Sequence, residues 1–190
     1  MSLSRILQAP RFLLAPLAIA AVVATGACDS LGDPNDSSEF PIEGDLYPAA
    51  MVQTCDGTAV ALADRIGQSD VTFITFAAKW CTACQKEAPI INTELIDGLA
   101  GRSVDVIQLL VENDPDEAPP LSLCSAWRDD LGARFDVLID VDQNSVPQHF
   151  GTAIETLPLH FIVTRDGKIR LRKLGALPED IKSRVEDWLP

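Results

Sequence analysis

Two cysteines separated by two residues, Cys81 and Cys84, have the clearest chemical potential in this chain. They lie in "AAKWCTACQKEAP" (77–89), which begins in the apolar, β-branched stretch "VTFITFAA" (71–78) and continues with apolar residues at helical spacing. This pattern predicts a strand that runs into a helix beginning at Cys81. Unsatisfied backbone N–H groups and the helix dipole at such a position stabilise a thiolate. Cys84 lies one turn further along the same helix face, where it can resolve a mixed disulfide made by Cys81.

A pair of cysteines at this spacing also forms half of many zinc sites. Such a site needs a second pair of ligands, whereas Cys55 and Cys124 are isolated along the chain. Neither His149 nor His160 has a ligand neighbour at zinc-finger spacing, and we interpret both as packing residues. The sequence therefore favours a redox pair over a metal site or an inert pair, and we expect no metal and no cofactor.

The first 27 residues have the pattern of a secretory signal. Arg5 and Arg11 precede the apolar run "FLLAPLAIAAVVATGAC", and no acidic residue is present in this part of the chain. As a membrane span the run is short, because it offers about 15 apolar residues interrupted by Pro16 and a crossing needs roughly 20. We therefore predict that residues 1–27 are a cleaved signal peptide.

The signal ends in small residues directly before a cysteine, Thr25-Gly26-Ala27-Cys28, which resembles the lipobox of bacterial lipoproteins. Thr25 departs from the leucine usual at its position, and an ordinary signal peptide cut near Ala27 is the alternative. Cysteine parity supports lipidation, because five cysteines leave one thiol unpaired in an oxidising compartment. We expect an acylated Cys28 that anchors the protein to a membrane.

The chain is acidic, with 15 Lys and Arg against 28 Asp and Glu. Loss of Arg5 and Arg11 with the signal leaves 13 against 28, a formal charge of −15. Nucleic acid and anionic headgroups are repelled by such a charge, so we expect no nucleic-acid partner. Residues 28–47 are rich in Asp, Ser, Gly and Pro and predict a flexible acidic tether.

Residues 48–190 are predicted to form one domain, because apolar strand-like segments alternate with amphipathic helical ones. Strands are predicted at 71–78, 104–112, 135–140 and 160–164, and helices at 81–100, 121–131 and 179–188. Asp56-Gly57 and Asp166-Gly167 are dipeptides favoured in hairpin turns and predict two β-hairpins. This order predicts an α/β domain in which a mixed sheet carries helices on both faces.

Over about residues 46 to 190 the chain resembles the thioredoxin superfamily, and within it the membrane-tethered TlpA and ResA branch of bacterial thiol:disulfide oxidoreductases. The resemblance rests on "FAAKWCTACQKEAP" (76–89), "ETLPLHFIVTRDGKI" (155–169) and "DGTAVALADRIG" (56–67). It implies a thioredoxin-like fold with a central mixed β-sheet, helices on both faces and an N-terminal β-hairpin. It also implies a thiol:disulfide oxidoreductase in which Cys81 attacks and Cys84 resolves.

Two further residues gain a role from this resemblance. It implies that Pro158 is a cis-proline facing the Cys81–Cys84 pair, and that Glu87 matches a glutamate kept near the active site in the ResA branch. Glu87 lies one turn beyond Cys84 on the predicted helix, where a carboxyl group suits proton transfer. The alternative for Glu87 is an ordinary solvated helix carboxylate.

The chain also departs from the family pattern. Thr75 stands where thioredoxins carry a buried aspartate, and Thr82-Ala83 replaces the proline-containing dipeptides common between the cysteines. The family resemblance therefore does not determine the redox potential of the Cys81–Cys84 pair. The resemblance implies a periplasm-facing envelope protein that reduces or exchanges disulfides of exported cysteine-containing proteins, with an upstream thiol as electron donor.

Two other functions belong to proteins of this fold. Copper-binding assembly factors of the Sco type use a cysteine pair and a histidine, but they place three residues between the cysteines, where this chain has two. In peroxiredoxin-like peroxidases a Thr or Ser lies three residues before the attacking cysteine, and Ala78 holds that position here. Both functions are kept as alternatives, with the peroxidase ranked last.

Cys55 and Cys124 are predicted to form a second, structural disulfide. With Cys28 lipidated and Cys81–Cys84 paired, these two are the remaining cysteines. Cys55 lies in the predicted N-terminal hairpin, which is expected beside the strand 104–112, and Cys124 opens the helix that follows this strand. The alternative is that both are buried small hydrophobic residues.

Overall fold

The computed structural model describes residues 40–151 and 153–190. The predicted signal peptide 1–27, the predicted lipidation site Cys28 and residues 28–39 of the predicted tether lie outside the described residues. Within the two described ranges, no helix has the length and apolar character needed to cross a membrane.

A seven-stranded mixed sheet forms the centre of the domain, with the order β2-β1-β5-β4-β3-β6-β7. The strands are β1 (Met51–Thr54), β2 (Ala59–Ala61), β3 (Val71–Ala78), β4 (Val104–Glu112), β5 (Asp136–Ile139), β6 (Leu159–Thr164) and β7 (Ile169–Leu174). β3, β4 and β5 are parallel, and the other neighbours pair antiparallel. Every residue of the central strand β3 is buried, which explains its continuous run of apolar and β-branched residues.

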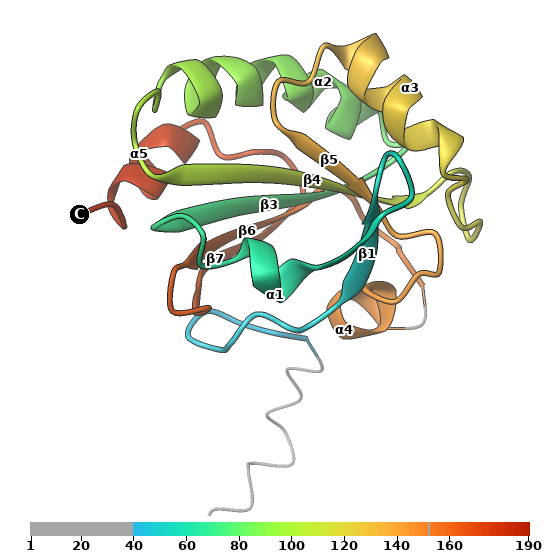
Figure 1. Ribbon diagram of the computed structural model, residues 1–190, viewed down its shortest axis with the longest axis horizontal. Helices are drawn as coiled ribbons and strands as arrows, with labels where there is room; N and C mark the ends of the chain where they lie inside the picture. Colours follow the sequence, from blue (N-terminus) through green and yellow to red (C-terminus); the bar gives the residue numbers. More distant parts are fainter. Residues whose placement is uncertain (1–39, 152) are drawn as a thin grey trace, which may run out of the picture. The chain divides into compact units, whose positions relative to one another are not determined.

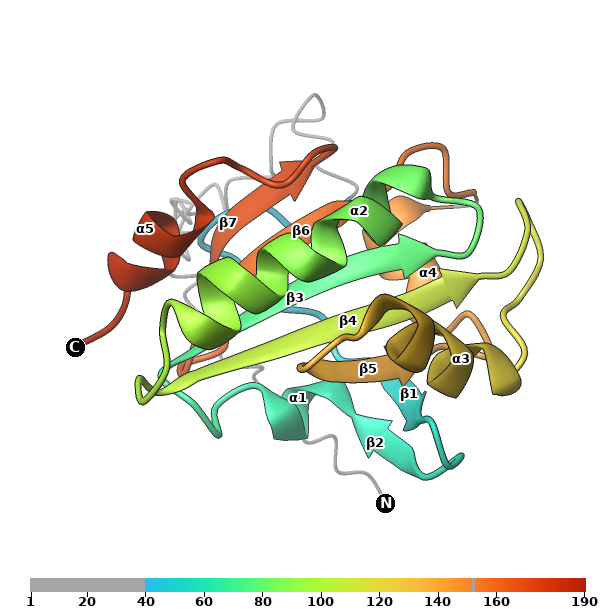
Figure 2. The ribbon, with the colours of Figure 1, turned by 90° about the horizontal axis from the view of Figure 1, so that it is seen from above.

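Helices cover both faces of this sheet, as the sequence predicts (Figure 1). The helical elements are α1 (Leu62–Arg65), α2 (Thr82–Ile91), the π-helical segment η1 (Asn92–Asp97), α3 (Ser122–Leu131), α4 (Val146–Phe150) and α5 (Ile181–Glu186). Figures 1 and 2 show α2 and α3 on one face, while α1 and α4 lie on the other. α5 packs beside η1 on the face of α2. The predicted helix 81–100 is thus shorter, since η1 ends before Gly98.

The sequence predicts the N-terminal hairpin beside the strand 104–112, and this prediction is wrong. β1 pairs antiparallel with β5, with Gln53 opposite Ile139, and β5 separates it from β4. β5 is short, but its last three residues are buried, and it pairs in parallel with β4. The order of strands depends on this long-range pairing, which the local sequence pattern does not contain.

The end of the predicted tether belongs to the domain, so the boundary placed at residue 48 is too late. The backbone N–H groups of Gly44 and Tyr47 donate to the carbonyl oxygens of Ile169 and Gly167, both at 2.8 Å. The Tyr47 ring is buried and packs edge-on against Phe161, with 5.3 Å between ring centroids. These contacts hold residues 44–47 against the β6–β7 hairpin.

Candidate active site

Cys81 lies at the junction between β3 and α2. β3 ends at Ala78 and α2 begins at Thr82, so that Cys81 is the N-cap residue of the helix. The backbone N–H of Cys84 donates to Cys81 Sγ at 3.1 Å. The two cysteines form a disulfide, with 5.3 Å between their Cα atoms. A thiolate released at Cys81 would face the same backbone donor at the positive end of the helix.

The two cysteine residues differ slightly in exposure. Cys81 is 4% exposed, whereas Cys84 has no exposed surface. Cys81 thus keeps a small exposed surface, while Cys84 lies one turn deeper in the helix and is fully buried. This difference agrees with the roles of attacking and resolving thiol.

Glu87 lies on the buried face of α2, one turn beyond Cys84, so it is not a solvated helix carboxylate. Its Oε1 accepts a hydrogen bond from the Leu177 N–H at 2.8 Å. Burial raises the pKa of Glu87 to about 7, although the Leu177 hydrogen bond opposes the shift. The Glu87 carboxyl group can therefore exchange a proton near neutral pH.

The Leu157–Pro158 peptide bond is cis. Pro158 directly precedes β6, and Leu159 pairs with Phe76 near the end of β3. Pro158 therefore lies near the end of β3 from which the chain continues to Cys81. The Pro158 carbonyl oxygen accepts from the Gly175 N–H at 2.8 Å, which ties it to the segment after β7.

Glu112 is a buried acid beside the cysteine motif that sequence reasoning missed. It ends β4, is 2% exposed, and accepts a hydrogen bond from the Trp80 indole N–H at 2.8 Å. Burial raises the pKa of Glu112, while hydrogen bonds from Trp80 and the Asp116 N–H oppose this. An acid directly after the apolar residues 109–111 is the only sequence signal for this contact.

Cys55 and Cys124 form the second disulfide that the sequence predicts. Their Cα atoms are 5.1 Å apart, and both sulfurs lie within 3.5 Å of the Val137 carbonyl oxygen of β5. Because a disulfide carries no S–H donor, these are packing contacts. The bond joins the β1–β2 hairpin to α3 across β5.

The two histidines are buried, as expected of packing residues. His149 lies among aromatic rings on the face of α4, and its Nδ1 is 2.7 Å from the Ser145 carbonyl oxygen. His160 stacks on Phe73 of β3. In the part of the chain that the structure describes, no cluster of three or more His, Cys, Asp or Glu side chains is close enough to hold a metal ion.

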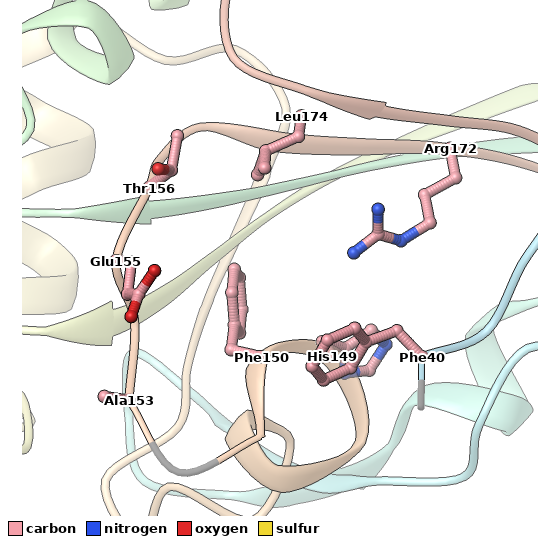
Figure 3. A pocket seen from close by; sticks show the side chains of 8 residues that line it. All are labelled: Phe40, His149, Phe150, Ala153, Glu155, Thr156, Arg172 and Leu174. Carbon is pink, nitrogen blue, oxygen red and sulfur yellow. The ribbon is translucent and has the colours of Figure 1, made fainter. Parts of the chain in front are cut away.

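A cavity of about 320 Å³ lies beside the segment that leads to Pro158 (Figure 3). It is lined by Phe40, His149, Phe150, Ala153, Glu155, Thr156, Arg172 and Leu174. The guanidinium group of Arg172 points into the cavity, and burial lowers its pKa. The lining contains neither cysteine pair, so the cavity is separate from the sulfur chemistry.

Replacing Glu87 with glutamine is expected to change how stability depends on pH. The pKa of Glu87 is about 7 in the folded protein, above its usual 4.5, so the folded state binds the proton more tightly. The stability that protonated Glu87 contributes to the free energy of unfolding is fully present below about pH 4.5 and is lost as the pH rises through about 7. The free energy of unfolding of the native protein should therefore fall relative to Glu87→Gln between about pH 5 and 7.

Urea unfolding of both proteins at a series of pH values measures this difference. Titration of the buried histidines affects the pH dependence of unfolding in both proteins, so its effect largely cancels in the comparison. A difference between the two proteins that does not vary with pH would contradict a raised pKa for Glu87.

The sheet order and the strand-to-helix junction that carries Cys81 and Cys84 define a domain of the thioredoxin superfamily. Solved structures agree on this fold. The thiol:disulfide interchange protein of Chlorobium tepidum TLS matches with a TM-score of 0.59 and 17% identity, over 77% of this chain and 97% of that chain. The peroxiredoxin-like protein of Aquifex aeolicus matches with a TM-score of 0.60 and 17% identity, over 78% of this chain and 88% of that one.

The chain belongs to the AhpC/TSA family, whose model matches residues 44–172. It is 28% identical over 146 residues to the thiol-disulfide oxidoreductase ResA of Bacillus thuringiensis (strain Al Hakam) and of Bacillus anthracis. The match covers 77% of this chain and 76% of each relative. The resemblance to the ResA and TlpA branch that the sequence motifs indicate is thus confirmed.

Proposed function

We propose that this protein is a cell-envelope thiol:disulfide oxidoreductase that acts through Cys81 and Cys84. The observation that carries the proposal is the position of Cys81 at the helix N-cap, where its sulfur accepts the Cys84 N–H while Cys84 itself is buried. The similarity to ResA supports the same activity. The substrates would be exported proteins that contain cysteine pairs.

The first step is attack by the Cys81 thiolate on a disulfide of the substrate. A bond forms between Cys81 Sγ and one substrate sulfur, the substrate S–S bond breaks, and the other substrate sulfur leaves as a thiolate. The N-cap position stabilises the attacking thiolate before this step. The product is a mixed disulfide at the accessible cysteine.

The second step requires a thiolate at buried Cys84. Glu87, one turn further along the buried face of α2, accepts the Cys84 proton, because its pKa near 7 suits transfer at neutral pH. Cys84 then attacks Cys81 Sγ, the mixed disulfide breaks, and the second substrate sulfur leaves as a thiolate. The substrate is reduced by two electrons, and the Cys81–Cys84 disulfide is formed.

A reducing partner completes the cycle. A dithiol of an upstream donor protein would attack the Cys81–Cys84 disulfide and become oxidised while the pair returns to thiols. The direction of net electron transfer depends on the reduction potentials of the donor and the substrate, because each exchange step is reversible.

Peroxidase activity is a second candidate, because the peroxiredoxin-like protein of Aquifex aeolicus shares this fold. The residue three positions before Cys81 is Ala78, whose methyl group offers no hydroxyl to orient a peroxide. We expect thiol–disulfide exchange to be fast and hydrogen peroxide consumption to be negligible. Rapid oxidation of Cys81 by peroxide would favour the peroxidase function.

Exchange with a peptide that contains one disulfide tests the proposed function. Protein with a reduced Cys81–Cys84 pair is mixed with excess peptide, and the cysteines are then alkylated and mapped by mass spectrometry. We expect peptide thiols to appear in step with loss of alkylation at Cys81 and Cys84. Unchanged peptide, or thiols supplied by Cys55 and Cys124, would contradict the proposal.

The proposed location is the periplasmic side of a membrane, with a lipid anchor at Cys28. The support is the sequence alone, namely the signal-like residues 1–27 and the small residues before Cys28. Cys28→Ser is expected to move the protein from the membrane fraction to the soluble periplasmic fraction of an expressing bacterium. If the variant stays with the membrane fraction, the lipoprotein interpretation is wrong. Thr25→Leu, which completes the lipobox pattern, is the control that should stay membrane-bound.

A further inference from the structure

His160 lies close to the buried carboxyl group of Glu87. It is on β6, two residues after Pro158, and its ring stacks on Phe73 with 5.8 Å between centroids and an interplanar angle of 19°. His160 Nε2 is 3.1 Å from the Gly175 carbonyl oxygen and 3.6 Å from Glu87 Oε2. Both side chains are buried, so little water competes for these contacts.

The segment Gly175–Leu177 connects these residues. The Gly175 N–H donates to the Pro158 carbonyl oxygen at 2.8 Å, and the Leu177 N–H donates to Glu87 Oε1 at 2.8 Å. Gly175 also accepts from His160. One short segment after β7 therefore holds Pro158, His160 and Glu87 in a fixed arrangement.

The carbonyl group of Gly175 determines which ring nitrogen of His160 carries the hydrogen. A carbonyl oxygen only accepts, so His160 Nε2 must bear the hydrogen that it receives. His160 Nε2 also lies 3.6 Å from Glu87 Oε2, too far for a normal hydrogen bond but close enough for its polarised N–H group to interact favourably with a negative oxygen. Within the described ranges, Glu87 Oε2 has no hydrogen-bond partner.

We propose that His160 is a positioning residue for Glu87, whose Nε2–H is fixed by Gly175 and favours the carboxylate form that takes the Cys84 proton. The inference rests on the proposed role of Glu87 as proton acceptor. One carboxylate oxygen then accepts the Leu177 N–H, and the other lies 3.6 Å from His160 Nε2, whose positive N–H end acts against the effect of burial. Without His160 the second oxygen would have no donor nearby, and the proton would stay on Glu87.

The surrounding charges agree with a neutral His160. Burial, together with a smaller effect of the positive charge of Lys173 on β7, lowers the pKa of His160 to about 4, although the Gly175 hydrogen bond opposes this shift. The groups facing it from β3 are Phe73 and Thr75, which carry no charge. Glu87 on α2 is the acid that faces the ring. His160 thus remains a neutral donor across the pH range in which Glu87 titrates.

Carboxyl and imidazole NMR titrations of the disulfide form test the inference. Protein labelled with ¹³C in the glutamate carboxyl groups and ¹⁵N in the histidines is titrated as native protein and as His160→Phe, which keeps an aromatic ring over Phe73. The pKa of Glu87 is expected to rise by about one unit in His160→Phe. His160→Gln, which restores a donor near the Nε2 position, should return it to within a few tenths of a unit of the native value.

His149→Phe is the matched control, because His149 is an equally buried histidine on α4, a helix that covers the opposite face of the sheet from α2 (Figure 1). It should leave the pKa of Glu87 unchanged. An unchanged or lower pKa in His160→Phe, or an equal rise in His149→Phe, would overturn the inference.

A titration of the native protein keeps the inference testable if the variants do not fold. The ¹⁵N chemical shift of His160 Nε2 is expected to change with pH at the midpoint of the Glu87 titration. A chemical shift that does not change at this pH would overturn the inference. These measurements use the oxidised protein, so they do not depend on exchange activity. If Glu87→Gln exchanges disulfides at the native rate, the proposed role of Glu87 fails, whereas the contact with His160 is still decided by NMR.

Discussion

Cys81→Ser is expected to lower the rate of thiol–disulfide exchange by about three orders of magnitude or more. A serine hydroxyl is not ionised near neutral pH and does not attack a disulfide, so the first step is lost. Cys84 does not replace Cys81, because its sulfur has no exposed surface. The rate of reduction of a disulfide-containing peptide, measured with a dithiol donor in excess, gives the effect.

A double variant, Cys55→Ala with Cys124→Ala, is the matched control for this experiment. It removes the same kind of atom from the other disulfide and should keep exchange near the native rate. Exchange by Cys81→Ser at more than about a tenth of the native rate would contradict the assignment of the attacking thiol.

The same double variant is expected to lose about 4 kcal/mol of unfolding free energy. The Cys55–Cys124 bond spans 69 residues of sequence, and closing so long a loop removes much of the freedom of the unfolded chain. Both cysteines are replaced together so that no unpaired thiol remains. Urea unfolding without reductant measures the loss, and a change below about 1 kcal/mol would show that the bond contributes little.

The redox pair and its helix were predictable because their signal is local. The apolar strand 71–78, the Cys81–Cys84 spacing and the helical pattern after it are contiguous in sequence. The hairpin turns at Asp56-Gly57 and Asp166-Gly167 are also local, and the structure places a hairpin at each. Elements of this kind follow from the conformational preferences of a few neighbouring residues.

Cysteine parity correctly predicts the disulfide between Cys55 and Cys124, although the sequence places the β1–β2 hairpin beside β4 and the structure places it beside β5. This pairing follows from a count of the cysteines and from the expectation that the hairpin and the helix with Cys124 lie near one another. The strand order needed the position of β5, which inserts between β1 and β4. A short strand with a few buried residues carries no local signal of its neighbours.

The polar contacts around the site were not predictable, because they join distant parts of the chain. Glu87 meets Leu177 across 90 residues of sequence, and Trp80 meets Glu112 across 32. The sequence pattern predicts only packing for His160, because its contact with Glu87 depends on how β6 lies against α2. Such contacts follow from the assembled fold and not from residue spacing.

The Cys84→Ser variant tests most directly whether Cys81 attacks and Cys84 resolves. This variant keeps the attacking thiol and lacks the resolving one, so the mixed disulfide with a cysteine-containing peptide should accumulate. Mass spectrometric mapping of the adduct is the measurement. We expect close to one peptide per protein molecule, attached to Cys81. A peptide on Cys55 or Cys124, or no stable adduct, would contradict these roles for the two cysteines.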